Sequence, residues 1–221
     1  MPVPEPIVLW GATGQARVLA DFLPELGFVI EALMDRDPGV PSLLPGVPVF
    51  RVEGAFRDWL RARPTPPAAL VAIGGDRGGD RLGNQQWLRD VGCRLVTAIH
   101  PRAIVAATAQ VGAGSQVLAG AVVGPGAALG EGVIVNTRAG VDHECRIGDG
   151  VHIAPGATLC GLVVVGALTF LGAGAVVLPR VRIGAGTVVG AGAVVTRDLP
   201  DNVVAYGQPA RIIRTRPLPL A

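Results

Sequence analysis

The second half of the chain places an aliphatic residue at every sixth position, from Val105 to Val195, without an insertion. The residue after it is often glycine, and the residue four positions on is mostly alanine or another small residue. A period of six is typical of a parallel β-helix, in which six residues form one short strand and one corner. Because three such units complete a coil, we expect the aliphatic row to fill a triangular prism.

The first hundred residues follow a different pattern, in which apolar runs alternate with amphipathic segments. Strands alternating with helices predict a parallel sheet with a Rossmann-like arrangement. Pro24 should weaken the last turn of the first helix. The expected strands lie at residues 5–10, 28–35, 46–50, 68–75 and 93–100, and the expected helices at residues 15–26, 53–63 and 81–92. We expect an α/β domain over residues 1–99, a β-helix over residues 100–202 and a C-terminal tail over residues 203–221.

Three of the expected strands end in glycine or aspartate. These ends are Gly11 to Gly14, Asp35, and Gly74 to Asp76. Parallel sheets bind ligands at the carboxyl ends of their strands. The short "GATG" is a weak signal, because it lacks the full dinucleotide motif and also suits a plain tight turn. Taken together, the three strand ends favour a site for a nucleotide or a nucleotide sugar.

The amino-acid composition excludes several classes of function. The chain has 221 residues, of which half are hydrophobic but only 4% aromatic, so the core must consist of small and branched aliphatic residues. Its basic residues are scattered arginines with no lysine, and the net charge is +2. This distribution argues against a nucleic-acid partner and excludes a lysine nucleophile. No apolar run predicts a signal peptide or a membrane span, so we expect a cytoplasmic protein with no membrane partner.

One hexad, "VDHECR", carries candidate chemistry. Because Val141 points inward, His143 and Glu144 should lie on the outer surface, and Cys145 should turn in as the small corner residue. One coil later stands Gly161, whose missing side chain leaves space beside the histidine. His143 could be a metal ligand, a surface residue or a general base.

The base interpretation is favoured. A zinc site needs three suitable ligands. With His100 ahead of the repeat, the β-helix supplies only His143 and His152, which are half a coil apart and cannot stack within one chain. The three cysteines show no metal-binding spacing. An imidazole near neutral pKa can accept a proton from an attacking amine or hydroxyl, with Glu144 or Asp142 on its other nitrogen.

Several segments resemble a known family. The hexads, "VDHECRIGD", "TFLGAGAVVLPRVRIGAGTVVGAGAVVTRDLPDNVV" and "GQPARII" resemble bacterial sugar acetyltransferases of the sialic acid O-acetyltransferase type. Within that family the chain looks most like the N-acetyltransferases that act on UDP-4-amino-sugars or GDP-perosamine. The resemblance covers almost the whole chain.

The resemblance implies a left-handed β-helix, a homotrimer, and acetyl-CoA bound in the groove between neighbouring prisms, without a metal. It implies His143 as catalytic base and Glu144 as the acid that raises its basicity. It further implies an acetyl-CoA site at His152, Gly161, Ala173 and Ala191, and a nucleotide-sugar site at Gly11, Thr13, Gln15, Asp35, Arg36 and Gly74.

Two positions depart from the family pattern. Gln15 stands where the family has a histidine, and Gly75 stands where it has an acid, with Asp76 one step later. Both lie in the expected nucleotide pocket, so the nucleotide sugar stays open. The sequence thus predicts transfer from acetyl-CoA to the amine of a nucleotide-linked sugar. The alternatives are O-acetylation of a sugar hydroxyl, a non-catalytic β-helix scaffold and a zinc-dependent hydratase.

Overall fold

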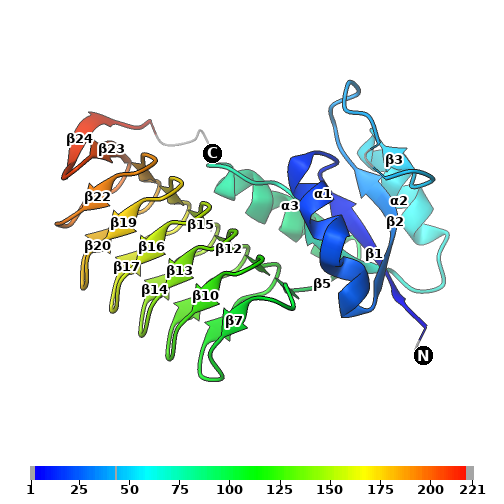
Figure 1. Cartoon of the computed structure of the whole chain (residues 1–221). Coiled ribbons are helices and arrows are strands. Elements are labelled where there is room, and N and C mark those ends of the chain that lie inside the picture. The colour runs from blue at the N-terminus through cyan, green and yellow to red at the C-terminus, as the bar shows by residue number, and fades with distance from the viewer. Residues whose placement is uncertain (1–2, 43, 218–221) are drawn as a thin grey trace.

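The computed structural model describes residues 3–42 and 44–217 (Figure 1). The N-terminal part contains a parallel sheet of five strands in the order β3-β2-β1-β4-β5. The strands are β1 (Glu5–Trp10), β2 (Phe28–Met34), β3 (Val49–Phe50), β4 (Ala68–Val71) and β5 (Arg94–Leu95). The helices are α1 (Gly14–Phe22), α2 (Glu53–Arg61) and α3 (Gly78–Asp90). The expected alternation of strands and helices is therefore confirmed.

Each face of this sheet buries its own apolar cluster. On one face, Leu9 and Leu70 pack against Leu19 of α1 and against Leu118 and Ile134 of the β-helix. The other face packs against α2 and α3, with Phe56 and Leu88 among its buried side chains. The sheet therefore lies between two layers, and the β-helix forms part of one of them.

Proline ends the first helix as expected. The α-helix stops at Phe22, and a 3₁₀ turn over Leu23–Leu26 follows, with Pro24 at its start. The single strand expected over residues 93–100 is wrong. The structure divides it into β5, which completes the N-terminal sheet, and β6 (Ala98–Ile99), which pairs with β9 (Gln116–Val117) of the β-helix. Residues 93–100 therefore contribute one strand to the N-terminal sheet and one strand to the β-helix.

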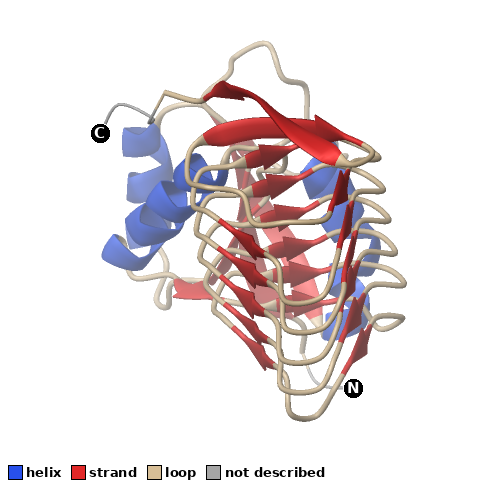
Figure 2. Ribbon diagram, turned by 90° about the vertical axis from the view of Figure 1, so that its left-hand side faces the viewer, coloured by secondary structure: helices blue, strands red, loops and turns tan. Residues whose placement is uncertain are grey.

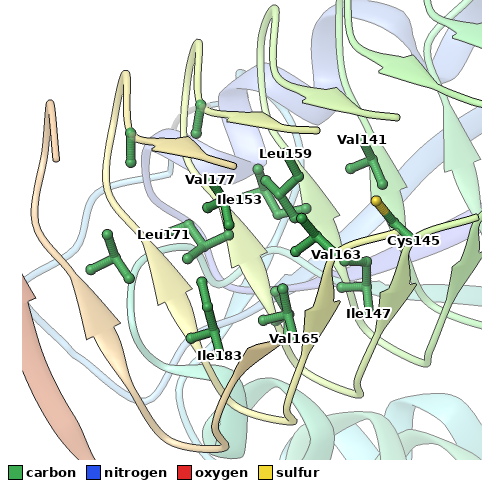
Figure 3. Close-up of a cluster of buried hydrophobic side chains, with 14 of the residues drawn as sticks. Val141, Cys145, Ile147, Ile153, Leu159, Val163, Val165, Leu171, Val177 and Ile183 are labelled. Atoms are coloured by element: carbon green, nitrogen blue, oxygen red, sulfur yellow. The ribbon is translucent and has the colours of Figure 1, made fainter. Parts of the chain in front are cut away.

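The second half forms a three-sided parallel β-helix (Figure 2). The first face contains β6, β9, β12, β15, β18 and β21, the second face β7, β10, β13, β16, β19 and β22, and the third face β8, β11, β14, β17 and β20. The strands from β7 onward are Ile104–Val105, Gln110–Val111, Gln116–Val117, Val122–Val123, Ala128–Leu129, Ile134–Val135, Gly140–Val141, Arg146–Ile147, His152–Ile153, Thr158–Leu159, Val164–Val165, Phe170–Leu171, Val176–Val177, Arg182–Ile183, Val188–Val189 and Val194–Val195. The second residue of each strand belongs to the predicted aliphatic row. These side chains fill the prism (Figure 3).

The glycines that directly follow the aliphatic row do not have unusual backbone angles. Gly112, Gly124 and Gly148 have no positive φ. A Cβ at Gly124 would lie 2.8 Å from backbone atoms of the next coil. Positive φ occurs two residues later, for example at Gly126 and Gly150, and Glu144 shares it with φ of 57°. Close packing of successive coils thus requires one glycine row, and the tight turns favour the other.

The expected tail contains regular structure. β23 (Val203–Gly207) pairs with β21 of the first face, and β24 (Ala210–Thr215) pairs antiparallel with β23. This hairpin lies at the far end of the coil (Figure 1). It covers the edge that β21 would otherwise expose. Across the described residues, no helix has both the length and the apolar character needed to cross a membrane.

Candidate active site

The sequence-predicted base, His143, lies at an outer corner of the β-helix. Its turn joins β13 on the second face to β14 on the third. The His143 side chain is 49% exposed and that of Glu144 is 59% exposed. Cys145 points into the prism, where burial raises the pKa of its thiol (Figure 3). The thiol therefore stays protonated and is unsuited to nucleophilic attack.

The two sides of the His143 ring have different environments. Nδ1 lies 3.1 Å from Oε2 of Glu144. The backbone N–H of His143 donates to Oδ1 of Asp142 at 2.7 Å, which holds the turn. Because a carboxylate accepts but cannot donate, Nδ1 carries the hydrogen, and in the neutral ring Nε2 then has a free lone pair. The corner thus offers a proton acceptor oriented by an acid, and it is Glu144, rather than Asp142, that contacts the ring.

Gly161 lies directly beneath the imidazole, one coil further on. A Cβ at this position would lie 2.2 Å from Nε2 of His143. The ring itself therefore occupies the space that the glycine leaves, so the expectation of open space for a ligand at this point is wrong. The backbone still stacks as predicted, with Leu162 donating to the carbonyl of His143 at 2.9 Å.

A shallow groove of about 190 Å³ runs beside this corner on the second face. Asp142 and Cys160 border it, close in sequence to His143 and Gly161. The other lining residues are mostly apolar or glycine: Val122, Gly124, Gly140, Val141, Thr158 and Leu159. A groove lined mostly by apolar residues and glycine suits an extended, weakly polar chain better than a charged group.

A second cavity, of about 330 Å³, lies at the carboxyl ends of β1, β2 and β4. Five of the residues predicted to bind the nucleotide sugar line it, namely Gly11, Thr13, Asp35, Arg36 and Gly74. Sequence reasoning missed Trp10, Arg77 and Asn84, which also line it. The structure therefore brings most of the expected pocket together, while its ligand stays a prediction.

Local packing explains the glycine and the acid at these strand ends. Gly11 has φ of 112°, and a Cβ there would lie 2.5 Å from the carbonyl oxygen of Ala72. Asp35 accepts backbone hydrogen bonds from Ala12 at 2.9 Å and from Asp37 at 3.0 Å. The glycine thus lets β1 and β4 approach, and the aspartate holds both loops that border the cavity.

Neither Gln15 nor Gly75, the two positions that depart from the family pattern, lines this cavity, and neither does Asp76. Gln15 donates to Oε1 of Gln116 at 2.6 Å, and the buried Gln116 in turn donates to the carbonyl of Val71 at 2.7 Å. Asp76 pairs with Arg216 at 3.2 Å. Both side chains therefore link the N-terminal part to the β-helix or to the C-terminal segment.

His152 is buried where the first face meets the loop after β4. Its Nδ1 lies 3.0 Å from the carbonyl oxygen of Gly75, and its Nε2 lies 3.0 Å from Nδ2 of Asn136. Burial first, and the charge of Arg81 second, lower the pKa of His152 to about 4. The ring is therefore neutral at physiological pH, donating to Gly75 and accepting from Asn136. Its expected contact with acetyl-CoA stays a prediction.

Arg81 is the largest fully buried side chain among the residues that the structure describes, and it was not singled out from the sequence. Its guanidinium donates to the carbonyls of Gly132 and Gly150 at 2.6 Å each and of Ile73 at 2.9 Å. Burial lowers the pKa of Arg81 to about 10, so the group is charged at neutral pH. It joins the loop that borders the cavity to two successive coils.

The predicted acetyl-CoA residues lie at three places on the β-helix. Gly161 shares the corner of His143, between the second and third faces. Ala173 and Ala191 stack at the corner between the first and second faces, where Gly192 donates to the carbonyl of Ala173 at 2.8 Å. His152 lies on the first face. A single chain therefore does not bring all four residues together. Within the part of the chain that the structure describes, no three histidine, cysteine or acidic side chains gather as a metal site.

Comparisons with known proteins agree with this arrangement. Residues 163–197 match the family model described as bacterial transferase hexapeptide (six repeats). The chain is 33% identical over 102 residues to GDP-perosamine N-acetyltransferase of Escherichia coli, a match that spans 45% of that protein. Repeats, corner histidine and strand-end cavity together define a hexapeptide-repeat transferase.

Two solved structures match nearly the whole chain. The acetyltransferase domain of PglB from Neisseria gonorrhoeae is 34% identical, with a TM-score of 0.86 over 95% of this chain and 100% of that one. PerB from Caulobacter crescentus, in complex with CoA and GDP-perosamine, is 42% identical, with a TM-score of 0.85 over 93% of this chain and 96% of that one. The chain therefore belongs to the family of bacterial sugar acetyltransferases that contains PerB and the PglB acetyltransferase domain.

Proposed function

We propose that this protein transfers the acetyl group of acetyl-CoA to the amine of a nucleotide-linked amino sugar, with His143 as general base. The observation that carries the proposal is the geometry of the corner, in which Glu144 holds Nδ1 of an exposed imidazole and leaves Nε2 free. The relatives support the substrates, since PerB was solved with CoA and GDP-perosamine. The left-handed sense of the coil and the Rossmann-like character of the N-terminal sheet belong to the same proposal.

The reaction needs no covalent enzyme intermediate. Neutral His143 accepts a proton at Nε2 as the sugar amine attacks the thioester carbonyl, and a C–N bond forms. The C–S bond then breaks, and the imidazolium returns its proton to the departing thiolate of CoA. Glu144 accepts from Nδ1–H throughout and stabilises the imidazolium while it exists. Proton transfer of this kind contributes roughly 10²–10⁴-fold to the rate.

The backbone at Gly161 offers a partner for the developing oxyanion. Its N–H donates no hydrogen bond to any other described residue, and a Cβ built on this residue would lie 2.2 Å from Nε2 of His143. A thioester carbonyl held there would have its oxygen near a backbone donor and its carbon near the attacking amine. Fixed donors of this type stabilise tetrahedral intermediates without reorganisation.

The positions of the two sites support a homotrimer with the active site between protomers. The N-terminal part packs on the first face, through His152 and Gln116. His143 lies at the corner between the other two faces. In a cyclic trimer, the corner of one protomer would meet the first face and strand-end cavity of its neighbour. The residues predicted to bind acetyl-CoA, which lie apart within one chain, would then come together from two neighbouring protomers.

Substrate comparison tests the proposal. Release of the CoA thiol from acetyl-CoA would be followed with amino sugars linked to UDP, GDP, dTDP and CMP, and with the matching sugars that carry a hydroxyl in place of the amine. We expect turnover with at least one amino sugar and little with its hydroxyl counterpart. Preference for the hydroxyl compounds would instead assign O-acetylation, and failure to bind acetyl-CoA at all would leave a scaffold.

A further inference from the structure

The segment after β24 contacts the rim of the strand-end cavity through one ion pair. Nη2 of Arg216 lies 3.2 Å from Oδ2 of Asp76, although the two residues are 140 positions apart in the chain. The backbone N–H of Arg216 donates to the carbonyl of Asn202 at 2.6 Å, which fixes this segment to the last corner of the β-helix. The pair therefore joins the far end of the β-helix to the loop after β4.

The loop after β4 forms one wall of the cavity, since four of residues 72–77 line it. The inner side of this loop is fixed to the rest of the protein. Arg81 donates to the carbonyl of Ile73 at 2.9 Å, and Nδ1 of His152 lies 3.0 Å from the carbonyl oxygen of Gly75. These two contacts hold the main chain of the loop as far as Gly75.

The outer part of the loop carries a positive charge into the cavity. Arg77 lines the cavity and the adjoining hollow, and its Nε lies 2.7 Å from Oδ2 of Asp80 on the first turn of α3. Asp76, directly before it, is the partner of Arg216. Because the planar peptide bond links consecutive residues, a shift of Asp76 would also move the backbone of Arg77. Arg216 can thus determine where Arg77 lies, although it does not line the cavity itself.

The guanidinium of Arg216 is only partly matched by its surroundings. Its Nη1 is buried and has no hydrogen-bond partner among the described residues. A buried donor without an acceptor lowers stability, and a half-exposed ion pair returns little. Such local conflicts are typical of functional positions. The departure from the family pattern agrees with this, because the acid missing at Gly75 stands one step later, at Asp76, where Arg216 reaches it.

We infer that Arg216 is a positioning residue for the strand-end cavity. Through Asp76 it holds the outer part of the loop after β4, so that Arg77 faces the phosphates of a bound nucleotide, a role that suits a guanidinium. The inference rests on the proposed function for the class of ligand. It assigns the far end of the β-helix an effect on nucleotide affinity and none on the acetyl-transfer corner at His143.

A double-mutant cycle in nucleotide affinity tests the inference. Asp76→Asn, Arg216→Met and the double variant of the full-length protein are titrated calorimetrically with GDP and with UDP, without acetyl-CoA. Each single variant should bind the more tightly bound nucleotide about fivefold more weakly than wild type, and the double variant should lose no more than either single variant. Arg94→Met is the matched control, because it removes an exposed ion pair with Glu5 at the other ends of the strands, and it should bind as wild type.

Steady-state kinetics separate positioning from a general loss of stability. Arg216→Met should raise the KM for an accepted nucleotide amino sugar about fivefold, while kcat and the KM for acetyl-CoA stay within about twofold of wild type. Wild-type nucleotide affinity in Arg216→Met, additive losses in the cycle, or no binding of either nucleotide to the wild type would overturn the inference. Coupled losses of nucleotide affinity in a protein that transfers no acetyl group would uphold it and refute the proposed function instead.

Discussion

At the scale of single residues, the candidate chemistry depends on which side chains lie one coil apart. His143 points outward because it follows an inward aliphatic residue, and it can lie flat on the surface because Gly161 has no side chain. Glu144 reaches the ring from a turn position with φ of 57°. This backbone region is unfavourable for residues other than glycine, so a carboxylate there has a local cost.

Substitution of Gly161 tests the stacking directly. Gly161→Ala would place a Cβ 2.2 Å from Nε2 and force the imidazole to move. We expect turnover to fall by about 10²-fold, because misplacement of a reacting group by an ångström has such effects. Stability should change by less than about 1 kcal/mol, since His143 is half exposed. Gly54→Ala on α2, where a Cβ meets nothing within 4 Å, is the matched control. Equal activity of the two variants would contradict the stacking.

The buried His152 makes stability depend on pH. Its pKa is about 4 in the folded protein, against 6.5 for an ordinary histidine. Between these values the unfolded chain binds a proton that the folded chain does not, so stability is complete above pH 6.5 and falls as the pH is lowered towards 4. We expect a loss of about 2 kcal/mol from pH 7 to pH 5 by urea denaturation. The loss should shrink in His152→Gln; an unchanged pH dependence would be inconsistent with a neutral, buried ring.

The residues of the site differ in how far the sequence predicts them. The period of six suffices for the outward direction of His143 and for placing Gly161 one coil away, but it leaves open whether Glu144 or Asp142 contacts the ring and does not show that the ring fills the space over Gly161. It does not reveal that His152 is buried, because that depends on where the N-terminal sheet docks. The period also does not reveal the hydrogen bond from Gln15 to Gln116. These residues are 101 positions apart, and they meet only because the N-terminal sheet docks on the β-helix.

At the scale of elements, α3 connects the two halves of the chain. Arg81 and Gln85 are four residues apart on this helix, and polar residues at that spacing are typical of a face exposed to solvent. Both side chains are nevertheless fully buried. The corners of the β-helix present carbonyl oxygens such as those of Gly114, Gly132 and Gly150, and these accept from the helix. A sequence pattern cannot reveal such a partner, because the acceptors belong to the backbone. The split of residues 93–100 into β5 and β6 was also missed, because each strand is set by its backbone pairing with a distant strand, β4 for β5 and β9 for β6.

Removal of the Arg81 guanidinium tests how much α3 stabilises the contact between the two halves of the chain. Arg81→Met keeps the length of the side chain but leaves the carbonyls of Ile73, Gly132 and Gly150 without their donor. We expect a loss of about 2–4 kcal/mol in the free energy of unfolding, because buried carbonyls lose a charged partner. Arg89→Met removes a half-exposed pair with Glu131 and should lose less than about 1 kcal/mol. Similar losses in the two variants would mean that Arg81 does not connect the halves.

At the scale of the whole molecule, the proposed active site combines surfaces that one chain holds apart. The cavity belongs to the side covered by the N-terminal sheet, and His143 lies at the opposite corner of the prism. The two-part architecture was predictable from the change in period near residue 100. The docking of the parts was not, because it rests on contacts between segments distant in the sequence, both apolar, as at Leu118, and polar, as between Gln15 and Gln116.

Mixed oligomers test whether the site lies between protomers. His143→Ala lacks the base, and Gly74→Phe should disrupt the cavity that Gly74 lines, because a Cβ there already lies 3.6 Å from Gln15 and 3.7 Å from His152. Each variant alone should be inactive. Co-expressed in equal amounts as cyclic trimers, they should recover about a quarter of the wild-type sites, because each mixed trimer contains one intact pair. A mixture as inactive as its components would place the whole site within one chain.

The most direct test of the account is the rate of acetyl-CoA-dependent acetylation of an accepted nucleotide amino sugar by His143→Ala, compared with wild type under saturating substrates at neutral pH. An exposed side chain contributes little to the core, so the variant should fold normally, while its turnover should fall by roughly 10²–10⁴-fold. Turnover equal to that of wild type in a folded His143→Ala protein would contradict acetyl transfer by this corner of the β-helix.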